Sequence, residues 1–172
     1  MVAANLQRIL VEKIGEITKD IQTTAANGDT VLGTNGYCQN LPVVTENEED
    51  YDQFFPYHIV RLMEGTTKEE SDPWAVQVYI LFGSYSEGKE HEGHFDVLEM
   101  CQRTVDHFTQ WPLIANFRAE GDMSWMLQDE DTYPYYFGVV AIRFTVPKIE
   151  RNEDETYEQK EKRNRWRYLP DE

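Results

Sequence analysis

The chain has 172 residues, of which 40% are hydrophobic and 13% are aromatic. This length fits one domain with polar appendages and leaves no room for two full hydrophobic cores. The formal net charge is -16, which argues against a sequence-reading DNA-binding protein and against binding to an anionic membrane surface.

The negative charge is concentrated in the first part of the chain. Residues 1–147 carry nine Lys and Arg against 24 Asp and Glu, a net charge of -15, whereas residues 148–172 carry seven against eight, a net charge of -1. A negative wall lets DNA pass without sticking, so the acidic body is compatible with a DNA conduit as well as with solubility alone.

The two cysteines, Cys38 and Cys101, form no Cys-x-x-Cys pair and no disulfide framework, which favours a reducing compartment. The N-terminal residues lack a charged region followed by an apolar run, so we expect no signal peptide. No segment reaches the roughly 18 apolar residues of a membrane span, and we expect no membrane partner.

The first predicted element is an amphipathic helix over residues 5–22. Its apolar positions recur at helical spacing: Leu6, Leu10, Ile14, Ile17 and Ile21. Residues 27–53 mix Gly, Asn, Thr and acidic residues, which predicts a long loop insertion. Within it, residues 31–32 and 41–44 are candidates for a short hairpin.

Two strands, over residues 54–63 and 75–84, are predicted to form an antiparallel hairpin with a loop of about ten residues. A second amphipathic helix follows, from Phe95 to a stop near Trp111 and Pro112. Cys101 lies on its apolar face and is expected in the core.

Two further strands are predicted, at residues 123–127 and 135–146. The last one is long and rich in β-branched and aromatic residues, which places it in the middle of the sheet. The order of elements predicts a single α+β domain over residues 1–147, with a mostly antiparallel sheet of about four strands and both helices on one face. We expect residues 148–172 to be a charged C-terminal arm, disordered or helical alone and ordered by a partner.

The only cluster of metal-ligand residue types is His91-Glu92-Gly93-His94. Its plainer interpretation is a solvated loop that caps the second helix, and the acidic runs at 46–52 and 129–131 lack the spacing of a calcium loop. His58 and His107 are isolated and are expected to be interfacial or partly buried. The chain has no phosphate-binding glycine loop and no nucleophile elbow, so we expect no cofactor, no metal and no enzymatic activity.

The candidate interface residues are aromatic and basic. Trp and Arg side chains are the types that dominate interface energies, and the arm offers local positive charge to an acidic body. The alternative is an arm without function. We assign to the interface Arg163, Arg165, Trp166, Arg167 and Tyr168 of the arm, and Tyr133 and Tyr135 at the start of the long strand.

Four short motifs give the chain a family resemblance. They are Phe55-Pro56-Tyr57-His58-Ile59-Val60-Arg61-Leu62, Val78 to Ser86 with its Phe82-Gly83, Gly93-His94-Phe95-Asp96-Val97-Leu98, and Tyr133-Pro134-Tyr135-Tyr136-Phe137-Gly138. With the N-terminal helix, this pattern resembles the tail terminator proteins, also called tail completion proteins, of tailed bacteriophages and of prophage or tail-like particles. The resemblance covers roughly residues 1–147.

The resemblance implies a structural protein that forms a ring, typically of six subunits, on the last ring of the tail tube. Such a ring stops tube polymerisation and presents the surface that meets the head. The implied partners are other copies of the chain, the tail tube protein, the head-tail connector proteins and, in a contractile tail, the sheath protein. DNA would pass through the channel without specific binding. The implied location is the head-proximal end of the virion tail, after assembly in the bacterial cytoplasm.

Three other functions remain open from the sequence. A head-tail connector or stopper ring is the nearest. A small acidic metal-dependent hydrolase would require His91 and His94 to converge with a distant carboxylate. An inhibitor that mimics DNA through its charge would carry its acids in a regular surface stripe and act as a monomer or dimer.

Overall fold

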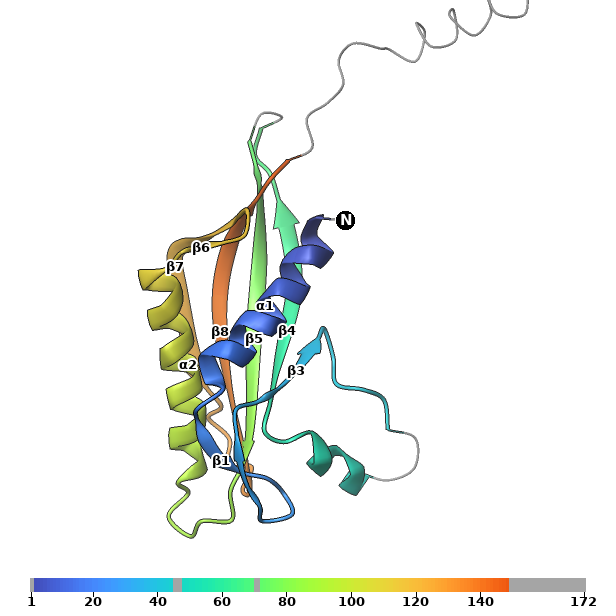
Figure 1. The fold of residues 1–172 in the computed structure, drawn as a ribbon, viewed down its shortest axis with the longest axis vertical. Coiled ribbons are helices and arrows are strands. Elements are labelled where there is room, and N and C mark those ends of the chain that lie inside the picture. The colour runs from blue at the N-terminus through green and yellow to red at the C-terminus, as the bar shows by residue number, and fades with distance from the viewer. Residues whose placement is uncertain (1, 45–47, 70–71, 149–172) are drawn as a thin grey trace, which may run out of the picture.

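The computed structural model of the protein describes residues 2–44, 48–69 and 72–148 (Figure 1). Residues 149–172, which contain nearly all of the predicted arm, lie outside this part. The elements, in chain order, are α1 (Val2–Thr18), β1 (Gln22–Thr24), β2 (Thr30–Leu32), β3 (Asn35–Cys38), the 3-10 helix η1 (Glu48–Phe54), β4 (Tyr57–Thr66), β5 (Trp74–Tyr85), α2 (Gly93–Gln110), β6 (Leu113–Ile114), β7 (Phe117–Leu127) and β8 (Tyr135–Val146).

The strands form one mixed sheet, and both helices lie on the same face of it (Figure 1). The predicted α+β class is confirmed, but the sheet has eight strands where about four were expected. Its order is β2-β1-β5-β8-β7-β6, while β4 also pairs with β5 and β3 pairs with β4. Only β3 and β4 run parallel; the other pairs are antiparallel.

The centre of the sheet is the antiparallel pair of β5 and β8. Twelve residue pairs join the two strands without interruption, from Trp74 opposite Val146 to Tyr85 opposite Tyr135. Since β7 pairs with the other side of β8, the predicted central position of this strand is confirmed.

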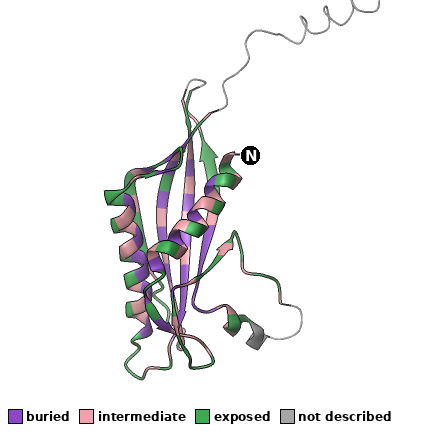
Figure 2. Ribbon diagram, viewed as in Figure 1, coloured by how far each residue is buried: buried purple, intermediate pink, exposed green. Residues whose placement is uncertain are grey.

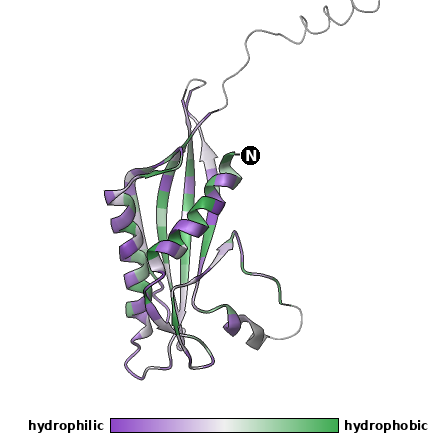
Figure 3. Ribbon diagram, in the orientation of Figure 1, coloured by the Kyte–Doolittle hydropathy of each residue, from purple (hydrophilic) through white to green (hydrophobic). Residues whose placement is uncertain are grey.

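The main core lies between the helices and one face of the sheet. Every second residue of β5 and β8 points into it, as the period of two along a strand requires. The helices contribute Leu6, Leu10, Ile14, Val97, Met100, Cys101 and Phe108, and the two central strands contribute Val76, Val78, Ile80, Phe82, Val140, Ile142 and Phe144. Figure 2 shows these positions as buried bands along the sheet and the inner sides of both helices, and Figure 3 shows that they are hydrophobic.

Two Phe-Gly dipeptides of the motifs lie opposite each other in the sheet. Phe82 pairs with Gly138, and Gly83 pairs with Phe137. A Cβ atom on Gly138 would lie 2.6 Å from Cγ1 of Val97, so the missing side chain lets α2 approach β8. On the opposite face, a Cβ atom on Gly83 would lie 2.5 Å from the Tyr57 ring. Both glycines are therefore required by close packing.

The prediction of a loop over residues 27–53 is wrong, because the segment contains β2, β3 and η1. The predicted hairpin is also wrong: β2 pairs with β1, and residues 41–44 form no strand. The first helix ends at Thr18, which frees residues 22–24 to form β1. The turn between β1 and β2 is closed by the Asn27 side chain, whose Oδ1 accepts a hydrogen bond from the Asp29 N–H at 3.0 Å.

β4, β5 and β7 differ from their predicted bounds, whereas β8 has the predicted ones. β4 begins at Tyr57 instead of residue 54, because residue 54 belongs to η1, and it ends at Thr66. β5 begins at Trp74, so the loop between β4 and β5 is residues 67–73. β7 begins at Phe117 instead of residue 123. Its pairing with β8 shifts between Ala119 and Met123, where three residues of β7 oppose one of β8. Because the bulge interrupts the alternation of side chains between the two faces, the first half of the strand could not be recognised from its sequence pattern.

Buried His58 ties β4 to α1 and to the segment before β3. Its Nε2–H donates to the carbonyl oxygen of Val11 at 2.9 Å, and its Nδ1 accepts from the hydroxyl of Thr34 at 2.7 Å. The Thr18 hydroxyl lies 2.8 Å from the Thr34 oxygen and 2.9 Å from the carbonyl oxygen of Ile14. His58 was expected to be interfacial or partly buried; it is almost completely buried, with 1% of the residue exposed.

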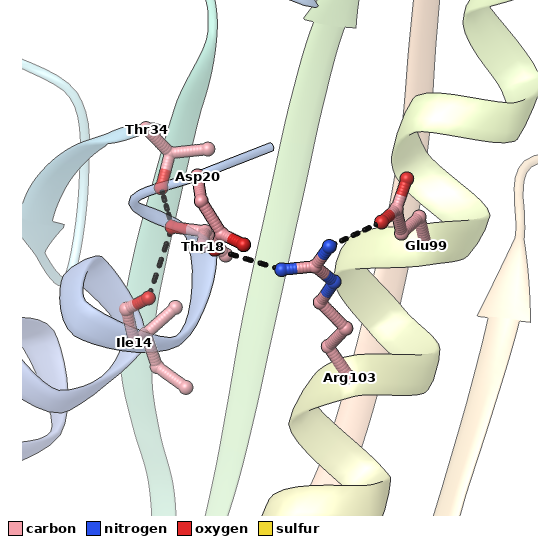
Figure 4. A network of polar contacts seen from close by, with 6 residues as sticks. All are labelled: Ile14, Thr18, Asp20, Thr34, Glu99 and Arg103. Atoms are coloured by element: carbon pink, nitrogen blue, oxygen red, sulfur yellow. Dashed lines mark hydrogen bonds and ion pairs between the residues drawn. The ribbon is translucent and has the colours of Figure 1, made fainter. Parts of the chain in front are cut away.

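An ionic contact joins α2 to the segment that follows α1 (Figure 4). The Arg103 guanidinium contacts Asp20, just after α1, at 2.8 Å and Glu99 on α2 at 2.6 Å. These side chains are largely exposed, so each ion pair stabilises the fold little. The apolar core and the buried His58 network hold α1 in place.

The close contact at Gly138 predicts a specific loss of stability. In the Gly138→Ala variant the new methyl group overlaps Val97, and overpacking of this kind costs about 1–3 kcal/mol. Urea denaturation should show a free energy of unfolding lower by this amount. Gly121→Ala is the matched control, because nothing lies within 4 Å of a Cβ atom at that position. Equal losses at the two positions would contradict the packing role of Gly138.

A pH-dependent contribution to stability follows from the burial of His58. Burial lowers the pKa of His58 from 6.5 to about 4, against a smaller opposing effect of the hydrogen bond to Val11. Between these values the unfolded chain binds a proton and the folded protein does not, so the stability due to neutral His58 is full above pH 6.5 and is lost as the pH falls to 4. The loss should be about 3 kcal/mol.

The measurement is the free energy of unfolding of the wild type minus that of His58→Gln, from pH 4 to pH 7. Titrations of all other groups largely cancel in this difference. The difference should shrink as the pH falls from 6.5 to 4. A difference for His58 that does not vary with pH would exclude this role of the buried imidazole.

Candidate assembly interface

The outer edge of β7 is one of the free edges of the sheet in the described part of the chain. On its outer side, β7 pairs only with β6, through Phe117 and Arg118. In the described part of the chain no strand covers residues 123–127, although their inner side is fully paired with β8. An open strand edge offers a row of backbone donors and acceptors to another chain.

This edge also carries large apolar side chains without charges. Residues 123–128 read Met-Ser-Trp-Met-Leu-Gln, between Asp122 and Asp129. The Trp125 and Met126 side chains are 44% and 65% exposed, and they lie on opposite faces of the strand. Proteins that stay monomeric usually protect such an edge with charged residues, so this segment has the character of a protein-binding surface.

The opposite edge of the sheet is formed by β3. This strand pairs with β4 on one side and has no strand partner on the other among the described residues. Residues 30–45 contain no Asp, Glu, Lys or Arg, in a chain with 28% charged residues. Asn35, Gly36 and Cys38 are exposed, while Tyr37 packs edge-on against Phe54 of η1.

The face of the sheet away from the helices is partly covered by a second apolar cluster. Its buried members are Phe55, Tyr57, Ile59 and Tyr85, and the half-buried Tyr37, Leu41, Phe54, Leu81, Tyr135 and Phe137 pack against them. The cluster fills the part of this face next to η1. Beyond it, Tyr79, Val139 and Ala141 remain half-buried on the same face.

Of the predicted interface residues, Tyr133 lies on the surface and Tyr135 does not. Tyr133 is 47% exposed, its hydroxyl donates to the carbonyl oxygen of Glu87 at 3.1 Å, and its ring contacts His91. Tyr135 is half-buried, and its hydroxyl donates to Oδ1 of Asp52 at 2.7 Å. That hydrogen bond, with burial, raises the pKa of Tyr135. Tyr133 is therefore accessible to a partner, whereas Tyr135 mainly anchors η1 to the sheet.

Tyr133 belongs to an acidic surface formed by two neighbouring loops, residues 86–92 and 128–134. The Ser86 N–H donates to the carbonyl oxygen of Pro134 at 3.0 Å, which holds the loops together. Glu87, Glu90, Asp129, Glu130 and Asp131 lie in these loops. A cavity of about 200 Å³ lies between the second loop and the start of α2.

His91 and His94, near the start of α2, make hydrogen-bonding contacts within the protein that indicate structural roles. Nδ1–H of His94 donates to the carbonyl oxygen of His91 at 2.7 Å, and Nδ1 of His91 lies 3.3 Å from the Tyr136 hydroxyl. Asp96 accepts a weak hydrogen bond from Ser84 at 3.3 Å, and burial raises the pKa of its carboxyl group. Among the described residues, no three His, Cys, Asp or Glu side chains are arranged to hold a metal ion.

The predicted interface residues of the arm, Arg163, Arg165, Trp166, Arg167 and Tyr168, lie outside the described residues. Trp125 and Met126 were predicted only as parts of a strand, because an uncharged run such as residues 123–128 occurs in central strands as well as at an unprotected edge. Neither α1 nor α2 has the length and apolar character needed to cross a membrane.

Comparisons with known proteins give no independent support for a family assignment. No protein-family model matches the chain, and a search of curated proteins found no significant match. The resemblance to tail terminators therefore rests on the four motifs and on the order of the elements that carry them.

Proposed function

We propose that this chain is a non-enzymatic assembly subunit that forms a ring, most simply a hexamer, at the head-proximal end of a phage tail tube. The observation that carries the proposal is the uncharged outer edge of β7, where Trp125 and Met126 are exposed beside unpaired backbone. Such an edge supports association between protein chains, and the motif resemblance indicates which assembly is formed.

The motifs behind the resemblance occupy positions that determine the shape of the subunit. Phe82-Gly83 and Phe137-Gly138 pair with each other at the centre of the sheet. At the start of α2, a Cβ atom on Gly93 would lie 2.4 Å from the Tyr136 ring. The motif residues therefore determine the strand pairing at the centre of the sheet and the distance between α2 and the sheet. This shared structural role supports the interpretation of the motifs as one pattern.

A ring of this kind needs no covalent chemistry to end tube growth. A growing tube end is a repeating template, so a subunit that complements it on one side and offers a different surface on the other stops further addition. A heterologous contact that closes on itself then fixes the number of copies. The same physics applies to a head-tail connector or stopper ring, which remains the second candidate.

The acidic body suits the inside of a DNA channel. With a net charge of -15 over residues 1–147, a ring of copies would present a strongly negative wall if acids line the lumen. DNA would then be repelled from the wall and stay mobile. In this proposal the partners are further copies, the tail tube protein and the connector proteins, together with the sheath protein where the tail contracts.

The assembly state is the first prediction of this proposal. We expect light scattering and negative-stain imaging to show a ring, either for the purified protein alone or after mixing with the tail-tube protein of the same phage. Tube ends should carry the ring and should stop growing. A protein that stays monomeric and never decorates tube ends would overturn the proposal.

The arm provides a separate prediction. Residues 160–168 contain five Lys and Arg against one Glu, with Trp166 and Tyr168. We propose that the arm contacts the acidic surface of a neighbouring copy or, in a contractile tail, the first sheath ring. A chain ending after Pro147 should fold but form less stable rings, or fail to attach sheath. A truncated chain with normal rings and normal sheath attachment would show that the arm is dispensable.

A further inference from the structure

The two free edges of the sheet lie at the same height along the strands. Starting at β3, Cys38 pairs with Val60, Val60 with Ile80, and Ile80 with Val140. Val140 in turn pairs with Trp125 on β7. Cys38 and Trp125 therefore occupy the two ends of one continuous row across the sheet.

The neighbouring rows agree. Tyr37 and Met126 are the ends of the row through Ile59, Leu81 and Val139, and Gly36 and Leu127 are the ends of the row through His58, Phe82 and Gly138. A second copy placed beside the first without a shift along the strands would bring β7 of one copy next to β3 of the other. From β3 to β7 the sheet contains one parallel pair, β3 with β4, and three antiparallel pairs, so β7 and β3 of neighbouring copies would run antiparallel.

The outward backbone groups also match at this register. The Gln128 N–H donates to the carbonyl oxygen of Phe137, so residues 126 and 128 bond inward while Trp125 and Leu127 direct their N–H and C=O groups to the free edge. On β3, the N–H groups of Asn35 and Gln39 donate to β4 or the residue before it, so Gly36 and Cys38 face outward.

We propose that neighbouring subunits join through β7 of one copy and β3 of the next, in an antiparallel ladder that pairs Trp125 with Cys38 and Leu127 with Gly36. The inference rests on the proposed ring and identifies its subunit contact. Both outward residues of one strand meet both outward residues of the other, as a hydrogen-bonded antiparallel ladder requires. The Cys38 carbonyl accepts from the Asn40 N–H at 2.8 Å, which leaves it one further lone pair for the ladder.

The side chains fit this pairing on both faces. Trp125 and Cys38 lie on the helix-covered face, so the exposed indole would pack beside the middle of α1 of the neighbouring copy, where Val11 lies close to Gly36. Met126 and Tyr37 lie on the other face, where the methionine would contact the tyrosine ring, a favourable pair for a thioether. The contact would thus cover the two large apolar side chains that are now exposed on β7.

The contact is heterologous, because it joins two different edges. Each copy keeps one free β7 edge and one free β3 edge until the chain of subunits closes. A heterologous contact forms a ring where its rotation closes and a rising helix where it does not, and the absence of a shift along the strands favours the ring. A ring is the shape that a tube cap needs. The paired segments, residues 123–127 of β7 and 35–38 of β3, contain no charged residues, which limits repulsion between two strongly acidic bodies.

Disulfide trapping tests the register directly, because Cys38 is already present and exposed. In the Trp125→Cys variant, directly opposed residues would place the Cα atoms about 5.5 Å apart, within the range of about 4.4–6.8 Å that a disulfide allows. Oxidation with diamide, which takes up the two thiol hydrogens, should give covalent dimers and higher oligomers on non-reducing gels. Cys101 is buried, and burial raises the pKa of its thiol to about 12, so it should not compete.

Three variants control the trapping. Trp125→Cys combined with Cys38→Ser should give far less covalent product. Met126→Cys places its thiol on the opposite face from Cys38, and Met63→Cys lies on β4, outside the contact. Both should trap at least tenfold less than Trp125→Cys under the same conditions. Equal trapping by Met63→Cys, in a protein that forms rings, would overturn the β7–β3 contact and leave the proposed function intact.

A charge placed at the edge gives a second test that needs no thiol chemistry. Met126→Lys should abolish ring formation, in solution or on tube ends, while Met63→Lys, at a methionine of similar exposure (59% against 65%), should leave rings intact. Both variants should keep the wild-type circular dichroism spectrum, since neither side chain is buried. Rings that survive Met126→Lys contradict the contact, whereas the absence of rings in every form of the protein, wild type included, contradicts the proposed function itself.

Discussion

The uninterrupted pairing of β5 with β8 determines where everything else in this protein lies. Twelve opposed residue pairs leave no freedom in register, because a slip by one residue would turn the core-facing side chains of a strand to the other face. The strands next to this pair, β4 and β7, take their register from it, and the missing side chain of Gly138 lets α2 approach β8 closely. The level alignment of the two free edges is a consequence of the same register.

Elements with a long and regular pattern could be predicted from the sequence. β4, β5, α2 and β8 follow from alternating or helical apolar spacing, and the central place of β8 follows from its β-branched run. The number of strands could not be predicted, because β1, β2, β3 and β6 have only two to four residues each, too few to show an alternating pattern. Their stability comes from pairing with longer strands, which is tertiary information.

The candidate interface was predictable in part. The aromatic start of β8 drew attention to Tyr133 and Tyr135, but sequence could not tell that the Tyr135 hydroxyl is used by Asp52 and that Tyr133 stays on the surface. The edge of β7 was visible as an uncharged strand between two aspartates. Whether a strand lies at the centre or at the edge depends on sheet order, and no local pattern in residues 123–127 encodes that order.

The negative charge of the body restricts which surfaces of two copies can come into contact. Two bodies with a net charge of -15 each repel one another, and at an ionic strength of 0.1 M this repulsion is largely screened only between charges more than about 10 Å apart. Close contact between copies is therefore least costly where neither surface carries charge. Two uncharged segments at the sheet edges, residues 123–128 and 35–38, meet this condition and belong to opposite edges of the sheet. Acidity elsewhere then helps specificity, because contacts in other orientations bring carboxylates together and are disfavoured.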